Sequence, residues 1–347
     1  MTHRLPAALL GLACCALPPA SAPAAAQTTA ATATTANAPR YDYGLAAQRL
    51  ADGVYALIGR DEDFTPRNGG NIVNTGFIVG SEGVVVIDTG PSRRYGEQLR
   101  AAIARITPLP VVLVINTHAH PDHFLGNQAF PAATLAALPA TRAAIVASGE
   151  ALADNLYRLT GDWMRGTNAV APGRTLQPGP LQAGGRALEL LAFEGHSAAD
   201  LAVLDRASGV LFAGDLLFHE RAPTTPDADF ARWLAALSQL QARSGVRLVV
   251  PGHGPVSATA ERPLVQTRAW LNGLRQHLND AAERGLDIND VLDTPLPPAL
   301  AALPEAGNEY RRAVLRHFAD AERAALAARV PAHDGTRPAI PTPPVSE

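Results

Sequence analysis

The segment VVLVINTHAHPDH, residues 111–123, is the most informative part of the sequence for predicting the fold. Its first five residues are apolar, as expected of a strand that is buried on both faces. The strand runs into a segment rich in histidine and aspartate. His118 and His120 are two residues apart, so in extended backbone their side chains project to the same side. Pro121 then suits the first turn of a helix.

Asp122 and His123 follow on that turn, from which they can face a second point nearby. One short segment therefore predicts two ligands for each of two neighbouring metal ions. Imidazole and carboxylate ligands without a thiolate suit Zn²⁺. Such a site also leaves Fe and Mn open as alternatives, more so than a site with cysteine ligands would. We expect two zinc ions as the cofactor.

Other short apolar runs are interpreted as strands: 72–79, 83–89, 188–193, 209–213 and 246–250. Four of these runs lead to a side chain that can bind metal: Asp88, His196, Asp215 and His253. Loops at the C-terminal ends of strands are where α/β sheets place their chemistry. We therefore expect five of the ten histidines at one edge of a sheet.

Helical periodicity occupies the segments between these runs. The predicted helices span 93–106, 140–164, 229–243, 263–284 and 309–328. Because strands and helices alternate, the pattern predicts an α/β protein with mixed layers rather than a helix bundle.

At these residues the sequence resembles the metallo-β-lactamase superfamily, from about Tyr41 to Val256 and more loosely through the C-terminal helices. Asp88 matches the first motif, a structural aspartate beneath the metals, and 118–123 matches the second. The third to fifth motifs match His196, Asp215 and His253. The resemblance implies a four-layer αββα sandwich with extra C-terminal helices and with the metals at one edge of the two sheets.

The resemblance also implies how the ligands divide between the two ions. The first ion would take His118, His120 and His196. The second ion would take Asp122, His123 and His253, with Asp215 bridging both.

Such a centre is expected to hydrolyse its substrate. Two metal ions about 3.5–4 Å apart can hold a bridging hydroxide, because zinc lowers the pKa of bound water to about 7. Asp122 is the predicted catalytic residue, since its carboxylate can orient the nucleophile and pass on its proton. The expected substrate is a small molecule with an ester, thioester, lactone or amide-type bond.

Asp215 stands where most zinc β-lactamases have Cys or Ser. An aspartate at this position is more similar to what the thioesterases and lactonases of the superfamily have. The segment 214–221 and the polar loop 60–71 look like those of exported zinc hydrolases associated with quinoprotein dehydrogenase systems. Phe64, His219 and Arg221 are candidate substrate contacts. The alternatives are a solvent-facing turn for Phe64 and ordinary surface roles for the other two.

Three other functions stay open at this point. A true metallo-β-lactamase would hydrolyse β-lactams, although the chain has no lysine to grip the β-lactam carboxylate. An iron-dependent persulfide dioxygenase would contain iron and consume oxygen. A non-catalytic metal-binding accessory protein would lack turnover, but every expected ligand position is filled.

The composition and the two ends of the chain place these expectations in context. The net charge of −3 gives no basic field for nucleic acid. Residues 1–26 are typical of a signal peptide for the periplasm or secretion, and cleavage would remove Cys14 and Cys15. A lipoprotein is the weaker alternative, because Gly11 stands where a large aliphatic residue is needed.

Four segments are therefore expected: the signal peptide, a flexible linker over 27–40, a metallo-β-lactamase-fold domain over 41–329 with C-terminal helices from about 263, and a disordered tail over 330–347. No apolar run in the mature chain is long enough to span a membrane, and we expect a monomer rather than a dimer.

Overall fold

Two β-sheets form the centre of the structure, a computed structural model that describes residues 41–329. The predicted signal peptide, linker and tail lie outside the described residues. The first sheet has seven strands in the order β1-β2-β3-β4-β5-β6-β7. These are β1 (Gln48–Ala51), β2 (Val54–Leu57), β3 (Thr75–Val79), β4 (Val84–Ile87), β5 (Val111–Ile115), β6 (Leu135–Ala137) and β7 (Arg174–Thr175).

The second sheet has five strands in the order β12-β11-β10-β9-β8. These are β8 (Gly179–Ala183), β9 (Arg186–Phe193), β10 (Asp200–Asp205), β11 (Val210–Phe212) and β12 (Leu248–Val250). The strands β4 to β7 of the first sheet pair in parallel, as do β11 and β12 of the second. The metal-binding segments follow β5, β9, β11 and β12, so the expected link between strand ends and chemistry is present.

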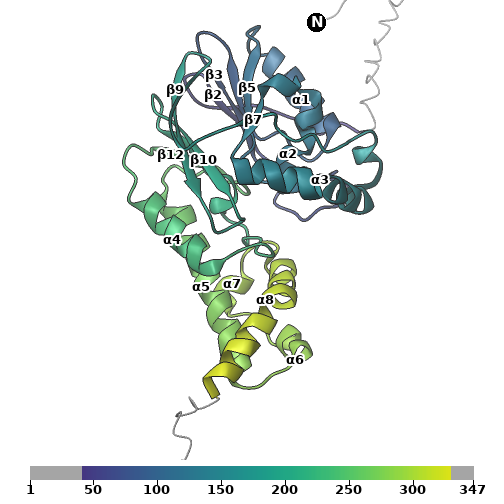
Figure 1. Cartoon of the computed structure of the whole chain (residues 1–347), viewed down its shortest axis with the longest axis vertical. Coiled ribbons are helices and arrows are strands. Elements are labelled where there is room, and N and C mark those ends of the chain that lie inside the picture. The colour runs from purple at the N-terminus through teal and green to yellow at the C-terminus, as the bar shows by residue number, and fades with distance from the viewer. Residues whose placement is uncertain (1–40, 330–347) are drawn as a thin grey trace, which may run out of the picture. The chain divides into compact units, whose positions relative to one another are not determined.

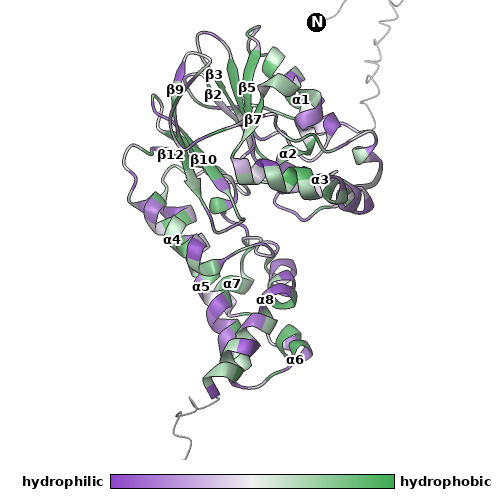
Figure 2. Cartoon of the chain, viewed as in Figure 1, coloured by the Kyte–Doolittle hydropathy of each residue, from purple (hydrophilic) through white to green (hydrophobic). Residues whose placement is uncertain are grey.

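Alternating side chains on the strands divide the core into layers. Val84 and Val86 of β4 pack outward against helix α1 (Arg93–Ala104), whereas Val85 and Ile87 pack inward against the second sheet. The outer face of the second sheet is covered by α4 (Phe230–Gln241). Figure 1 shows α1 beside the first sheet and α4 beside the second, and Figure 2 shows that the strands are largely apolar. This arrangement confirms the predicted four-layer sandwich.

Other helices complete the outer layers: α2 (Pro121–Phe124), α3 (Pro139–Thr160), α5 (Glu261–Glu283), α6 (Ile288–Asp293), α7 (Pro298–Ala301) and α8 (Ala306–Arg329). Four short 3₁₀ helices are η1 (Leu125–Ala129), η2 (Ala132–Thr134), η3 (Gly161–Met164) and η4 (Gly214–Leu216). Trp270 of α5 and Phe318 of α8 belong to the same buried cluster as α4, so the predicted C-terminal helices pack on the sandwich. No helix within residues 41–329 combines the length and the apolar character needed to cross a bilayer.

Two differences from the predicted elements have local causes. The strand expected over 72–79 begins only at Thr75, because Asn74 bonds to the loop that carries His253. Strand β10 was not predicted, although all six of its residues are buried. Its sequence DLAVLD begins and ends in aspartate, which is uncommon in strands.

Candidate metal centre

The seven predicted ligands lie together in two facing groups. One group consists of His118, His120, His196 and Asp215, and the other of Asp122, His123 and His253. Within each group the ligand atoms lie within 4.8 Å of one another. His120 is the most accessible of the seven, with a side chain that is 19 % exposed, and the other six are buried. The structure therefore brings together every residue that the sequence proposed as a ligand.

The first group has its three imidazoles around one point. Nδ1 of His120 lies 2.9 Å from Nε2 of His118 and 2.9 Å from Nε2 of His196. The carboxylate of Asp215 closes the group, with Oδ2 at 3.3 Å from Nε2 of His196. Tetrahedral coordination with bonds of 2.0–2.1 Å separates ligand atoms by about 3.3 Å, so the spacing suits a metal ion.

The second group also contacts the Asp215 carboxylate, through both of its oxygens. Oδ1 of Asp215 lies 3.1 Å from Nε2 of His123, and Oδ2 lies 3.3 Å from Nε2 of His253. Asp122 completes the group, with Oδ2 at 3.4 Å from Nε2 of His253. Asp215 thus contacts ligands of both groups, as a bridging carboxylate must.

Asp88 sets the tautomer of one histidine in each group. Its Oδ2 accepts a hydrogen bond from Nδ1 of His123 at 2.8 Å and another from the Thr117 hydroxyl at 2.8 Å. Because the Thr117 hydroxyl hydrogen points to Asp88, the oxygen is free to accept from Nδ1 of His118 at 3.0 Å. The Nε2 atoms of His118 and His123 are therefore left bare and face the centre.

Two more ligands are oriented in the same way. Nδ1 of His253 donates to the Ile72 carbonyl at 2.8 Å, which leaves its Nε2 bare. His120 is turned the other way, since its Nε2 donates to Asp227 at 3.0 Å and its Nδ1 faces the first group. Asp227 was not predicted from the sequence, because nothing in the segment after Asp215 distinguishes it from other loop aspartates.

The loop that carries His253 is fixed by close contacts. The side-chain amide of Asn74 donates to the carbonyls of Pro251 at 2.9 Å and Gly254 at 2.7 Å. Gly252 has no side chain for a specific reason, because a Cβ there would lie 1.9 Å from Oδ1 of Asp215. Asn74 also escaped prediction, since a lone asparagine before a strand carries no distinctive pattern.

The segment that carries His196 is fixed by a buried carboxylate. Asp200 accepts from the backbone N–H groups of His196 and Ser197, both at 3.0 Å. Burial raises the pKa of Asp200 to about 6, although its hydrogen bonds to Ser197 oppose the shift. Trp233 packs edge-on against the His196 ring, with centroids 5.0 Å apart. The imidazole therefore has little freedom to rotate.

The chemistry of the donor set fits metal cations. Bare nitrogens of His118 and His120 lie 2.9 Å apart, and two lone pairs at that separation repel unless a cation lies between them. Nε2 of His123 and Oδ1 of Asp215 are buried 3.1 Å apart, and within residues 41–329 neither atom bonds to a group outside the seven ligands. Burial lowers the pKa of His196 to about 3, which keeps its imidazole neutral as a ligand must be.

Negative charge also gathers on the second group. Burial opposes protonation of His123, but the carboxylates of Asp215, Asp88 and Asp122 outweigh it and raise its pKa well above the usual value. The pKa of Asp215 is held well below its usual value, since the neighbouring histidines outweigh the effect of burial. An ionised carboxylate among imidazoles is a ligand set for zinc or a similar ion.

A cavity of about 250 Å³ opens beside the ligands Asp122, Asp215 and His253. Phe64 lines it, as does Arg221, although the Arg221 side chain is only 1 % exposed. His219 is not among its lining residues, and its Nδ1 lies 2.9 Å from the Pro255 carbonyl oxygen. A role in substrate binding stays a prediction for Phe64, Arg221 and His219.

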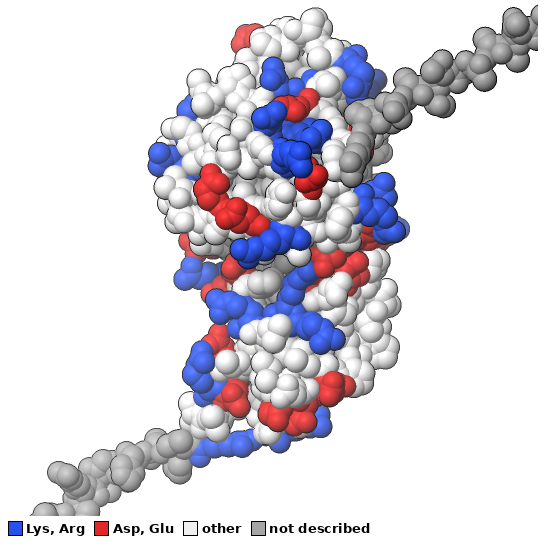
Figure 3. All heavy atoms as spheres, turned by 90° about the vertical axis from the view of Figure 1, so that its right-hand side faces the viewer, with Lys and Arg blue, Asp and Glu red and all other residues white. Residues whose placement is uncertain are grey.

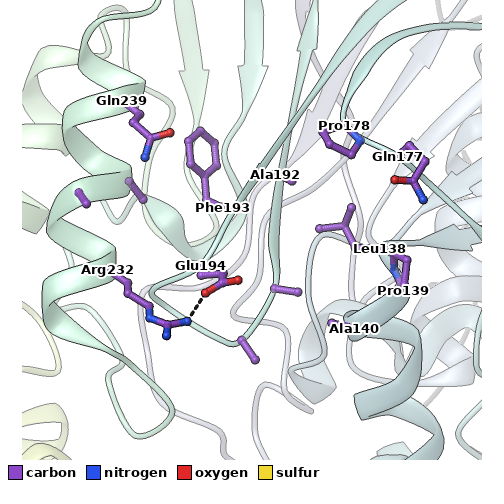
Figure 4. Close-up of a pocket in the computed structure, with 14 residues that line it drawn as sticks. Leu138, Pro139, Ala140, Gln177, Pro178, Ala192, Phe193, Glu194, Arg232 and Gln239 are labelled. Atoms are coloured by element: carbon purple, nitrogen blue, oxygen red, sulfur yellow. Dashed lines mark hydrogen bonds and ion pairs between the residues drawn. The ribbon is translucent and has the colours of Figure 1, made fainter.

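A larger groove of about 580 Å³ lies elsewhere, between the start of α3, strand β9 and helix α4 (Figure 4). Phe193 and the ion pair between Arg232 and Glu194 line it, but none of the seven ligands does. The face in Figure 3 intersperses acidic and basic side chains. That face offers no large field of one sign for a polyanion.

Comparison with known proteins agrees with this geometry. The sequence pattern of the Metallo-beta-lactamase superfamily matches residues 68–253. The chain is 29% identical over 238 residues to a bovine (Bos taurus) protein named acyl-coenzyme A thioesterase MBLAC2, which covers 59% of this chain and 79% of that protein. The human protein of that name gives the same identity and coverage.

Solved structures share the fold. A metallo-beta-lactamase from Pontibacter korlensis superposes with a TM-score of 0.51 at 23% identity, covering 66% of this chain and 99% of that one. Metallo-beta-lactamase IND-7 gives a TM-score of 0.51 at 20% identity, covering 66% and 98%. The match of sequence pattern over more than half of the chain, together with the ligand geometry, shows that this protein belongs to the metallo-β-lactamase superfamily.

Proposed function

We propose that the protein is an exported metal-dependent hydrolase that cleaves an acyl thioester or a related activated ester. The observation that carries the proposal is the pair of facing ligand groups joined by Asp215, at the wall of a cavity large enough for a small acyl group. When bound, the metal ions supply an activated water molecule and a Lewis acid for the carbonyl oxygen.

The residues of this chain have separate tasks in such a reaction. The five histidines, Asp122 and Asp215 would hold the ions, and Asp88 keeps His118 and His123 in the tautomers that leave Nε2 bare. Asp122 lies at the edge of the second group and lines the cavity, where its carboxylate can accept a proton from the nucleophile and pass it to the leaving group.

Two observations favour a thioester over a β-lactam. The named thioesterases are similar in sequence over most of their own length, whereas the lactamase structures share only the fold at this level of identity. A second cavity of about 400 Å³ shares His120, Leu152 and Asp227 with the metal cavity. Its lining is mainly small and apolar, with Ala119, Ala140, Ala144, Ala198 and Ala199. Such a surface suits an acyl chain.

We also propose a location and a context. Residues 1–26 support export to the periplasm or beyond, and the segments 60–71 and 214–221 support an association with quinoprotein dehydrogenase systems. Both proposals rest on the sequence. Detection of the protein in a periplasmic extract, with its new N-terminus near residue 27, tests the first of them.

A substrate panel tests the reaction itself. The metal content of the purified protein is measured first, and zinc-loaded protein is then given acyl thioesters, lactones, phenyl esters and the β-lactam nitrocefin. Turnover of thioesters above the other classes supports the proposal. Preferential turnover of nitrocefin makes the protein a β-lactamase instead, and native iron with oxygen uptake on glutathione persulfide makes it a dioxygenase.

A further inference from the structure

The loop over residues 60–71 is tied to the C-terminal helix α8. Oδ2 of Asp63 lies 2.5 Å from Nη2 of Arg312, although the two residues are 249 positions apart. Both side chains are only partly exposed, at 25 % for Asp63 and 36 % for Arg312. An ion pair that is partly shielded from water holds its geometry better than one on the open surface.

Arg312 is itself held in place by the neighbouring side chain of Glu309. Its Nη1 donates to Oε1 of Glu309 at 2.7 Å, and the Glu309 side chain is fully buried. The same Oε1 accepts from the Thr224 hydroxyl at 3.0 Å. Thr224 belongs to the segment between Asp215 and α4. Hydrogen bonds through Glu309 therefore connect Arg312 to the segment that follows the metal ligand Asp215.

The Asp63 carboxylate also fixes the backbone of Phe64. While Oδ2 pairs with Arg312, Oδ1 accepts the backbone N–H of Phe64 at 2.8 Å. The Asp63 carbonyl accepts from the Asn68 amide at 2.8 Å, which braces the rest of the loop. Phe64, Asp63 and Arg312 all line the cavity of about 250 Å³ that also contains Asp122 and His253.

This connection lies outside the part of the chain that the superfamily pattern describes. The pattern matches residues 68–253, whereas Asp63 precedes that range and α8 follows it. The ion pair therefore joins two segments that the pattern does not include, at the place where the C-terminal helices reach the cavity.

We propose that Arg312 is a positioning residue which, through Asp63, holds Phe64 over the metal cavity and thereby limits the size of the acyl group that fits. The inference rests on the proposed hydrolysis and names the element that sets its selectivity. With the loop held, small acyl groups pack against Phe64 and bulky ones are excluded. With the loop released, KM for small substrates rises and the discrimination against bulky ones falls.

The variants Asp63→Asn and Arg312→Gln test this proposal. Asp63→Asn keeps an oxygen for the Phe64 N–H but replaces the negative partner of Arg312. Each variant should raise KM for a short-chain thioester about fivefold, with kcat and metal content retained. The double variant should raise KM no more than the single ones, because both remove the same interaction. Asp320→Asn is the matched control, since it breaks an exposed ion pair with Arg323 elsewhere on α8.

A second readout follows the loop without reference to turnover. Arg67 is 78 % exposed and offers a trypsin site inside the loop. Cleavage after Arg67 should be faster in Asp63→Asn and Arg312→Gln than in the control. Unchanged cleavage, or equal loss of kcat for short and bulky thioesters, would overturn the proposal. If the wild type hydrolyses no thioester, the proposed function fails. The rates of trypsin cleavage after Arg67 still test whether Arg312 holds the loop.

Discussion

Oδ2 of Asp88 accepts a hydrogen bond from Nδ1 of His123 at 2.8 Å, and the same oxygen reaches His118 through the Thr117 hydroxyl. One buried carboxylate thus fixes a ligand of each metal group. Asp88 has a φ of +57°, in the left-handed region that aspartate and asparagine tolerate better than most residues. Its backbone turns the end of β4 beneath the metals while its side chain orders both ligands.

Replacement of this carboxylate should weaken both metal sites together. Asp88→Asn keeps a residue that tolerates the left-handed backbone, but the amide cannot accept all the hydrogen bonds that the carboxylate accepts. We expect the affinity for both ions to fall about 10- to 100-fold, as for other partners of metal-bound histidines. Competition with a chromophoric chelator measures this, with exposed Asp52→Asn as the control. Unchanged affinity would show that the tautomers are fixed by other means.

Loss of Asp227 should affect only one of the two sites. Asp227→Ala removes the acceptor for Nε2 of His120, so that the imidazole can rotate or change tautomer. The affinity for one ion should fall about tenfold, while the second ion binds as in the wild type. A two-step metal titration separates the ions, and equal weakening of both steps would contradict this assignment.

Gly252 provides a steric test of the bridging carboxylate. In Gly252→Ala the new Cβ would lie 1.9 Å from Oδ1 of Asp215, so the carboxylate or the loop must move. We expect less than one ion per chain and a lower Tm. Gly307→Ala is the control, because nothing lies within 4 Å of its added Cβ. Full metal content in Gly252→Ala would mean that Asp215 does not bridge the two groups.

Removal of the ions should destabilise the fold. A ligand that binds only the folded state at 100 times its Kd stabilises by about 2.7 kcal/mol. Treatment with a chelator should therefore lower the Tm by several degrees, and addition of zinc should restore it. The absence of any shift would show that the ligands are equally well ordered without metal.

The sequence predicted most of the centre because its signals are local. The sequence alone shows the spacing from His118 to His123. It also shows the glycine that precedes each of His196, Asp215 and His253. The partners that orient these ligands were missed, because Asn74, Asp200 and Asp227 reach the site only through tertiary contacts. Strand β10 was missed for a related reason, since Asp200 and Asp205 at its ends are stabilised by partners that the fold supplies.

For the C-terminal helices, too, the elements could be predicted from the sequence but their tertiary contacts could not. Their existence was predicted from periodicity, and the structure contains them as α5 and α8. The contact of Arg312 with Asp63 was not predicted, because two charged residues 249 positions apart carry no sequence signal. Arg221 was expected to be either an ordinary surface residue or a substrate contact. It is buried, and its Nη2 donates to the Glu62 carbonyl at 3.3 Å, so the surface role is wrong, whereas the substrate contact stays a prediction.

We infer that two metal ions, held by the five histidines, Asp122 and Asp215, carry out hydrolysis. The most direct measurement is the rate of thioester hydrolysis by fully demetallated protein during titration with zinc. We expect no activity without metal and full activity at two ions per chain. His118→Ala should neither bind two ions nor recover activity at this stoichiometry. Hydrolysis that persists in the demetallated protein, or that is unchanged in His118→Ala, would contradict this inference.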